Sequence, residues 1–127
     1  EVGSQATPFE HRSFGEELNL AYRYYYRWDA NDDYGNLTMG MTQSDTTCRG
    51  TYNLPNTMRA SPAMTSNGTF RVYDGSASRT VSGITFVRSS DHHLFIQFAG
   101  SSYTTHRMSE MGANNDSDAY IEFNAEL

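Results

Sequence analysis

Short stretches in which apolar and polar residues alternate make up much of the chain beyond residue 36. The clearest are 70–73, 84–87, 93–98 and 120–125, and Leu37, Met39 and Met41 form a similar set. Alternation with a period of two places the apolar side chains of a strand on one face. Several short strands at this spacing predict a mostly β domain, an antiparallel β-sandwich or small barrel of jelly-roll type.

These strands also indicate where the core lies. Within 93–98 and within 120–125 every second residue is apolar. Val81 lies on the parity opposite to the apolar residues that follow it, which predicts a bulge near Gly83. Phenylalanines at strand positions are expected core residues, and these are Phe70, Phe86, Phe98 and Phe123.

Two longer connections interrupt the strands. The segment 52–62 contains Pro55 and Pro62, which lack the N–H that a hydrogen-bonded ladder requires. We expect this segment to cross the domain in an extended form. The segment 109–117 contains Gly112 and two asparagines, and we expect it to be an exposed loop.

One short α-helix is predicted near the N-terminus. Ser13-Phe14-Gly15-Glu16 has the form of a capping box, in which each side chain accepts a hydrogen bond from the other residue's backbone N–H. Apolar residues then recur at spacings of three and four, so one stripe of the helix should face a core. The aromatic run 22–28 favours a pleated surface, and we expect a change from helix to strand near residues 22–24. The stripe comprises Phe14, Leu18, Ala21, Tyr22 and Tyr25.

A chain of 127 residues is long enough for one domain with its own core. Residues 1–12 contain Gly3, Pro8 and small polar residues, and we expect an extended linker or the end of a preceding module there. The β-rich domain then comprises residues 13–127. No apolar run approaches the about 20 residues that a membrane-spanning helix needs, so membrane insertion is not expected.

The charge of the chain argues against binding to nucleic acid. Fifteen acidic residues against nine basic ones give a net charge of −6, and all nine basic residues are scattered arginines. Binding to a phosphate backbone relies on clustered positive charge. Cys48 is the one cysteine, which excludes an internal disulfide. We expect it to be a small buried residue, with intermolecular pairing or a reactive thiol as alternatives.

The sequence carries no catalytic or metal-binding motif with the required spacing. Asp91 and His93 can share one face of a strand while His92 points the other way; the alternative is a hairpin turn with polar ends. The acidic segments 29–35 and 114–118 supply oxygen ligands without the Gly and Glu positions of a calcium loop. There is neither a Gly-rich phosphate loop nor a nucleophile elbow. We therefore expect no enzyme activity, no bound metal and no cofactor.

Aromatic residues near loops are candidates for binding a glycan. The chain has nine Tyr, seven Phe and one Trp. An exposed ring can stack on a sugar while acidic, amide and guanidinium groups bind the hydroxyls. The alternative for each is a ring that packs inside with its polar end in water. The candidate glycan-binding residues are Trp28, Tyr34, Tyr52, Asp91, His93 and Tyr103.

The N-terminal segment resembles a junction found in many bacteriophage tail-fibre, tail-spike and related receptor-binding proteins. The likeness covers the first 28 residues and the last few, with two departures: Phe14 stands where Tyr is more frequent, and Ala21-Tyr22 where Cys-Gln is expected. The matching phrases are Val2-Gly3-Ser4-Gln5-Ala6-Thr7-Pro8-Phe9-Glu10, His11-Arg12-Ser13-Phe14-Gly15-Glu16-Glu17-Leu18, the aromatic run Tyr24-Tyr25-Tyr26 and the final Ala125-Glu126-Leu127.

The resemblance implies a C-terminal fibre domain on the virion, outside the cell. Such a domain assembles as a homotrimer, joins other virion proteins and contacts a host-surface polysaccharide. No catalytic residue is carried over. Two alternatives stay open: a purely structural domain that trimerises or caps a fibre, and part of a polysaccharide-degrading spike, which would need paired carboxylates across a groove.

Overall fold

The computed structural model describes residues 13–125 as one helix and nine strands. Within this range no helix is long and apolar enough to cross a membrane. In chain order the elements are α1 (Phe14–Ala21), β1 (Tyr25–Asp29), β2 (Asn36–Thr42), β3 (Thr47–Asn53), β4 (Ala63–Asn67), β5 (Phe70–Tyr73), β6 (Ser78–Ser89), β7 (His93–Gly100), β8 (Met108–Ala113) and β9 (Tyr120–Asn124).

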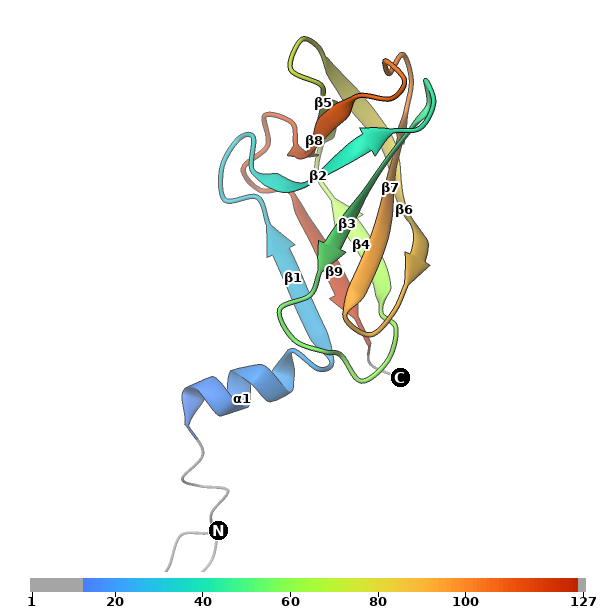
Figure 1. Ribbon diagram of the computed structural model, residues 1–127. Coiled ribbons are helices and arrows are strands. Elements are labelled where there is room, and N and C mark those ends of the chain that lie inside the picture. Colours follow the sequence, from blue (N-terminus) through green and yellow to red (C-terminus); the bar gives the residue numbers. More distant parts are fainter. Residues whose placement is uncertain (1–12, 126–127) are drawn as a thin grey trace, which may run out of the picture.

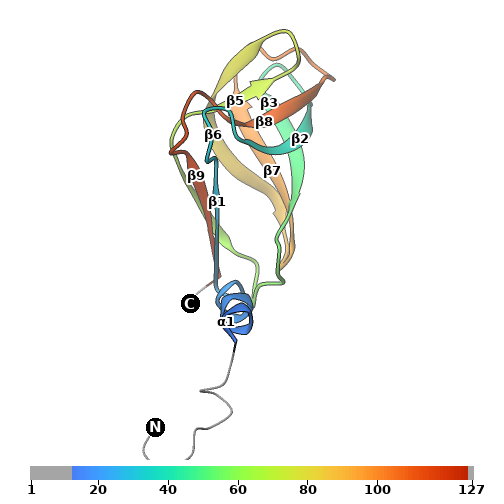
Figure 2. The same ribbon diagram turned by 90° about the vertical axis from the view of Figure 1, so that its left-hand side faces the viewer.

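Six of the strands close into an antiparallel barrel in the order β2-β3-β7-β6-β5-β8, and β1-β9-β4 forms a second antiparallel sheet. Figures 1 and 2 show an elongated molecule with α1 at one end, which we call the helix end. The connections 43–46, 74–77 and 101–107 lie together at the other end, the loop end. This architecture confirms the prediction of a mostly β antiparallel fold with one short helix.

Aromatic rings join the second sheet to the barrel. The ring of Phe123 in β9 stacks on those of Tyr26, Tyr52 and Phe86, with centroids 5.9–6.4 Å apart. Phe123 is fully buried. These contacts come from β1, β3 and β6, so one side chain ties three strands of both sheets together.

Most of the expected core is confirmed. The two apolar faces predicted for β7 and β9 are buried, and so is Cys48. The register of β6 against β7 shifts between Val81 and Gly83, where the bulge was predicted. Phe86 is only partly buried, and its ring packs on Phe123 in the contact between barrel and second sheet.

The helix begins as predicted but its stripe does not face a core. Ser13 Oγ accepts from the Glu16 N–H at 3.2 Å, and Glu16 Oε2 accepts from the Ser13 N–H at 3.0 Å. β1 begins at Tyr25, close to the expected change from helix to strand. Every residue of α1 is nevertheless exposed, Phe14 by 80%. The prediction of a core-facing stripe is wrong because α1 projects beyond the end of β1, where no described element covers it (Figures 1 and 2).

The expected alternation in β2 is wrong after its first residues. A register shift between Asn36 and Thr38 reverses the parity, so Leu37 is buried while Met39 and Met41 are 48% and 40% exposed. Gly40 takes the inner position instead. A Cβ there would collide with the Met111 side chain, so the barrel has room for that large side chain only opposite a glycine.

The segment 109–117 is not the exposed loop that we expected. Its first five residues belong to β8, in which Ser109, Met111 and Ala113 are buried. The strand is hard to recognise from sequence because small residues occupy inner positions that apolar ones usually fill. The segment 54–62 does cross from β3 in the barrel to β4 in the second sheet, while Tyr52 belongs to β3 itself.

Candidate functional site

A groove opens on the outer face of the barrel at the helix end. Its volume is about 340 Å³, within the range of small-molecule sites. Strands β3, β6 and β7 and the turn after β6 contribute its walls. We call it the β6–β7 groove; its lining residues are Thr51, Arg88, Ser89, Ser90, His93 and Phe95.

Strand register brings these residues together. Phe95 lies opposite Thr51 of β3 on one side and opposite Arg88 of β6 on the other. A second register shift, between Phe86 and Arg88, sets this pairing. Because Leu94 and Ile96 point into the core, Phe95 points outward and forms the apolar part of the groove.

The turn at the rim of the groove is held by hydrogen bonds. Ser90 Oγ donates to the His93 carbonyl at 3.1 Å and accepts from the His93 N–H at 3.0 Å. The backbone N–H groups of Leu54 and Met58 donate to the carbonyls of His92 and Asp91. The crossing segment therefore fixes the turn before any ligand arrives, which lowers the entropic cost of binding.

Two polar side chains in the groove differ in how they are held. His93 Nδ1 lies 2.7 Å from Asn53 Oδ1, so the ring is oriented by its neighbour in β3. The Arg88 side chain has neither a hydrogen bond nor an ion pair with any residue in the described range 13–125. Its guanidinium is thus available to a ligand, and carboxylates match that group in two parallel hydrogen bonds.

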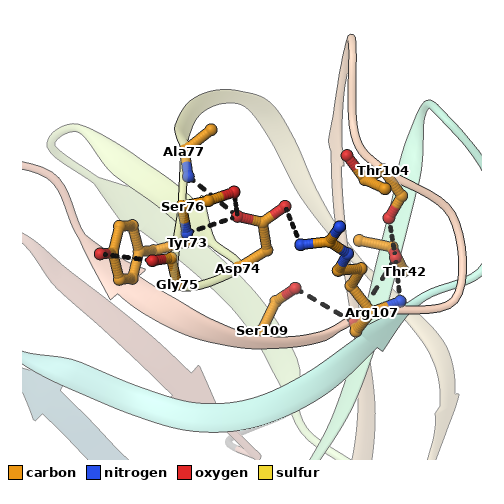
Figure 3. A network of polar contacts seen from close by, with 9 residues as sticks. All are labelled: Thr42, Tyr73, Asp74, Gly75, Ser76, Ala77, Thr104, Arg107 and Ser109. Carbon is orange, nitrogen blue, oxygen red and sulfur yellow. Dashed lines mark hydrogen bonds and ion pairs between the residues drawn. The ribbon is translucent and has the colours of Figure 1, made fainter.

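The polar residues at the loop end form a closed network instead. Figure 3 shows the Asp74 carboxylate accepting from the N–H groups of Ser76 and Ala77 and facing Arg107. These backbone hydrogen bonds, with that of the Ser76 hydroxyl and the nearby guanidinium, lower the pKa of Asp74 to about 2. Thr42 Oγ1 donates to the Thr104 carbonyl and accepts from the Arg107 N–H.

Little space is left for a ligand in this network. The cavity beside it measures about 10 Å³, roughly the volume one water molecule needs. We therefore interpret the network as the closure of three connections over the end of the barrel.

The structure separates the aromatic residues predicted to bind glycan. Trp28 is 9% exposed and packs on Phe70, with ring centroids 6.4 Å apart. Tyr103 is 5% exposed, its OH donates to the Phe98 carbonyl, and burial raises its pKa to about 12. Neither ring has a free face for a sugar.

The other two aromatic candidates lie apart from each other. Tyr52 is half-buried, and its OH donates to Tyr26 Oη at 3.3 Å. Burial and this hydrogen bond raise the pKa of Tyr52. Tyr34 is 49% exposed, and the Arg71 guanidinium lies over its ring at 4.6 Å. Tyr34 is the only one of the four rings with an open surface.

Asp91 and His93 do not form the pair that their shared parity suggested. Asp91 Oδ1 lies 2.6 Å from His92 Nδ1 instead. Of the six candidates from the sequence, His93 alone lines the β6–β7 groove. The sequence did not indicate Arg88 or Phe95 as site residues. Phe95 could have been recognised, because it is an aromatic residue between two core residues of β7 and must therefore point outward.

The acidic loops use their oxygens internally. Asp32 Oδ1 accepts from the Tyr34 N–H, and the two oxygens of Asp116 accept from Thr69 and Asp118. Among the residues from 13 to 125, no three His, Cys, Asp or Glu side chains gather as a metal site.

Comparisons with protein-family profiles, curated proteins and solved structures return no match to this chain.

Proposed function

We propose that the chain is a terminal, non-catalytic domain of a bacteriophage virion fibre and assembles as a homotrimer through α1. The observation that carries this proposal is the uncovered apolar stripe of the helix. Phe14 and Leu18 are 80% and 38% exposed, one turn apart on the same side. Water contact of this stripe is unfavourable, and packing against copies of the same helix removes it.

The length of α1 supports an assembled state. Helices of fewer than about 12 residues are marginal in water without tertiary packing, and α1 has eight residues and no buried side chain. Its capping box holds only the first turn. A helix retained in this form needs a partner surface.

The sequence around α1 supports a fibre rather than another oligomer. The stretch up to Leu18 resembles the junction of phage fibre and spike proteins, whose terminal domains are usually trimers. In such an arrangement α1 packs at the centre and the outer face of each barrel, which carries the β6–β7 groove, is exposed to the surroundings. Contact with host polysaccharide and with other virion proteins belongs to the same proposal.

Sedimentation equilibrium tests the assembly. The wild-type protein should have three times the 14.3 kDa mass of one chain. Leu18→Ser should dissociate it, because the change places a hydroxyl in the stripe. Leu20→Ser is the matched control: Leu20 is also about 40% exposed but lies about 200° around the helix from Leu18.

Near-ultraviolet circular dichroism of both variants checks that the barrel stays folded. A wild-type protein that is monomeric over a wide concentration range contradicts the proposal, and so does an equal effect of the two substitutions.

A glycan array separates host recognition from the purely structural alternative. Reproducible binding to bacterial surface polysaccharides supports recognition, while a blank array with a trimeric protein leaves a fibre domain that assembles without a host ligand. Shortening of the polysaccharide on incubation would instead favour the spike alternative.

A further inference from the structure

The β6–β7 groove combines features of a ligand site that the loop end lacks. It has volume, one apolar floor residue, an oriented imidazole and a guanidinium without a partner in the described chain. From these features we propose that the groove binds an acidic saccharide, with Arg88 pairing with the sugar carboxylate. This inference rests on the proposed role in host contact and names the site and the ligand class.

The arginines show why Arg88 stands out. Most of the others in the described range are engaged by partners within the fold. Arg27 pairs with Asp29, Arg49 donates to Gln97, and Arg59 donates to the Ala125 carbonyl. Arg71 lies over two tyrosine rings, and Arg107 faces Asp74. Arg88 lies in a groove and lacks such an acceptor, so a ligand can supply one.

The sign and number of charges favour a carboxylate on a sugar. The chain carries a net charge of −6, which repels a polyanion such as nucleic acid. One guanidinium in a shallow groove suits a single anionic group that forms two parallel hydrogen bonds. Asp91, the acidic residue of the adjoining turn, is directed to His92 and does not line the groove.

The remaining lining residues suit the rest of a sugar ring. The half-buried Phe95 ring offers an apolar surface. This surface lies next to Arg88, because the two residues are paired across β6 and β7. His93 has Nδ1 held by Asn53, which leaves Nε2 for a hydroxyl. Thr51 adds an exposed hydroxyl on the opposite side of Phe95. Sites of this kind place a few polar groups around an apolar floor.

Titration of the ¹⁵N-labelled protein by NMR tests the site. The probes are the single-carboxylate sugars galacturonic acid and N-acetylneuraminic acid, each compared with its methyl ester, which keeps the sugar and removes the charge. At least one acid should shift the backbone amide signals of residues 88–95 and of Thr51. The Kd of its ester should be at least about tenfold higher, a loss of about 1.4 kcal/mol in binding free energy.

Arg88→Gln should weaken binding of that acid by about tenfold or more, the loss expected for a charge-assisted pair. Arg79→Gln is the matched control, because Arg79 is an exposed arginine of the same strand at the loop end. It should leave the affinity unchanged.

The proposal is overturned if neither acid shifts these amides at millimolar concentration, if the esters bind equally well, or if galactose 1-phosphate binds more tightly than both acids. The oligomeric state is measured separately. A trimer with an inert groove refutes the acidic-sugar site and leaves the fibre assembly intact. A monomer that binds the acid refutes the assembly and leaves the site.

Discussion

The two ends of the molecule contain the same kinds of polar groups and use them in opposite ways. At the loop end, Asp74 and Thr42 receive their hydrogen bonds from within the chain, and Arg107 faces Asp74. At the helix end, Arg88 has no partner in the described range, and the apolar stripe of α1 is uncovered. Polar groups that are bonded within the chain stabilise the fold, whereas an exposed polar group without a partner in the fold stays available to a ligand.

The contrast follows from where the chain connections run. Three connections meet at the loop end, and backbone N–H groups of two of them donate to the Asp74 carboxylate and the Thr42 hydroxyl. At the helix end, the backbone N–H groups of Leu54 and Met58 in the crossing segment bind the turn, and Ser61 Oγ lies 3.3 Å from Ser89 Oγ. None of these contacts reaches the exposed Arg88 guanidinium.

The largest expected effect tests the junction between the two sheets. Phe123→Ala removes the ring that stacks on three aromatic neighbours from both sheets. We expect a loss of about 3–5 kcal/mol of unfolding free energy, the usual cost of removing a buried Phe ring. Urea denaturation measures it, with Thr65→Ala on the exposed face of β4 as control. A loss under 1 kcal/mol would show that the sheets do not depend on this contact.

Gly40→Ala should cost about 1–3 kcal/mol, the range for overpacking a core. The new methyl would lie too close to both the Met111 sulfur and the Arg49 carbonyl oxygen. Gly83→Ala is the control, since a methyl there meets no atom within 4 Å. Thermal unfolding compares the two, and equal melting temperatures would refute the proposed packing.

Asp74→Ala should destabilise the loop end by about 1–2 kcal/mol at neutral pH. The pKa of Asp74 is lowered from 3.8 to about 2 in the folded protein, so its contribution is complete above about pH 5 and is lost as the pH falls through about 2. The stability difference between the wild type and the variant should therefore be largest above about pH 5 and should shrink steadily toward pH 2. Urea titrations from neutral pH to pH 2, with the exposed Asp118→Ala as control, check it; a difference at pH 2 as large as that at neutral pH contradicts the assignment.

Arg88→Gln should have the smallest effect on stability, within about 0.5 kcal/mol, as for surface changes that break no contact. The guanidinium forms no hydrogen bond or ion pair in the described fold, so its removal leaves no other group without a partner. A loss above 1 kcal/mol by the same urea assay would place Arg88 in a structural role and remove the contrast between the two ends.

The strands that obey simple alternation could be predicted from the sequence, while those that small residues or bulges modify could not. Leu94, Ile96 and Phe98 follow the period of two and are all buried. In β8, by contrast, Ser109 and Ala113 occupy inner positions, so the sequence of this strand is more typical of a loop.

The site was harder still to predict. Trp28 and Tyr103 are adjacent to loops in sequence, but the fold turns both rings inward. Arg88 acquires its place from a bulge in its own strand, from the next strand β7 and from the distant strand β3, and no local pattern around it signals a groove. Strand pairing and register, rather than residue type, decide which polar groups remain free.

Amide hydrogen exchange in α1 tests most directly whether the helix end is an interface between chains. A helix of eight residues without buried side chains should exchange almost as fast as an unfolded peptide in a single chain. In the assembled wild-type protein we predict slow exchange of the amides of residues 17–22, retained in Leu20→Ser and lost in Leu18→Ser. Fast exchange of these amides in the wild-type protein at high concentration would contradict the assembly through α1.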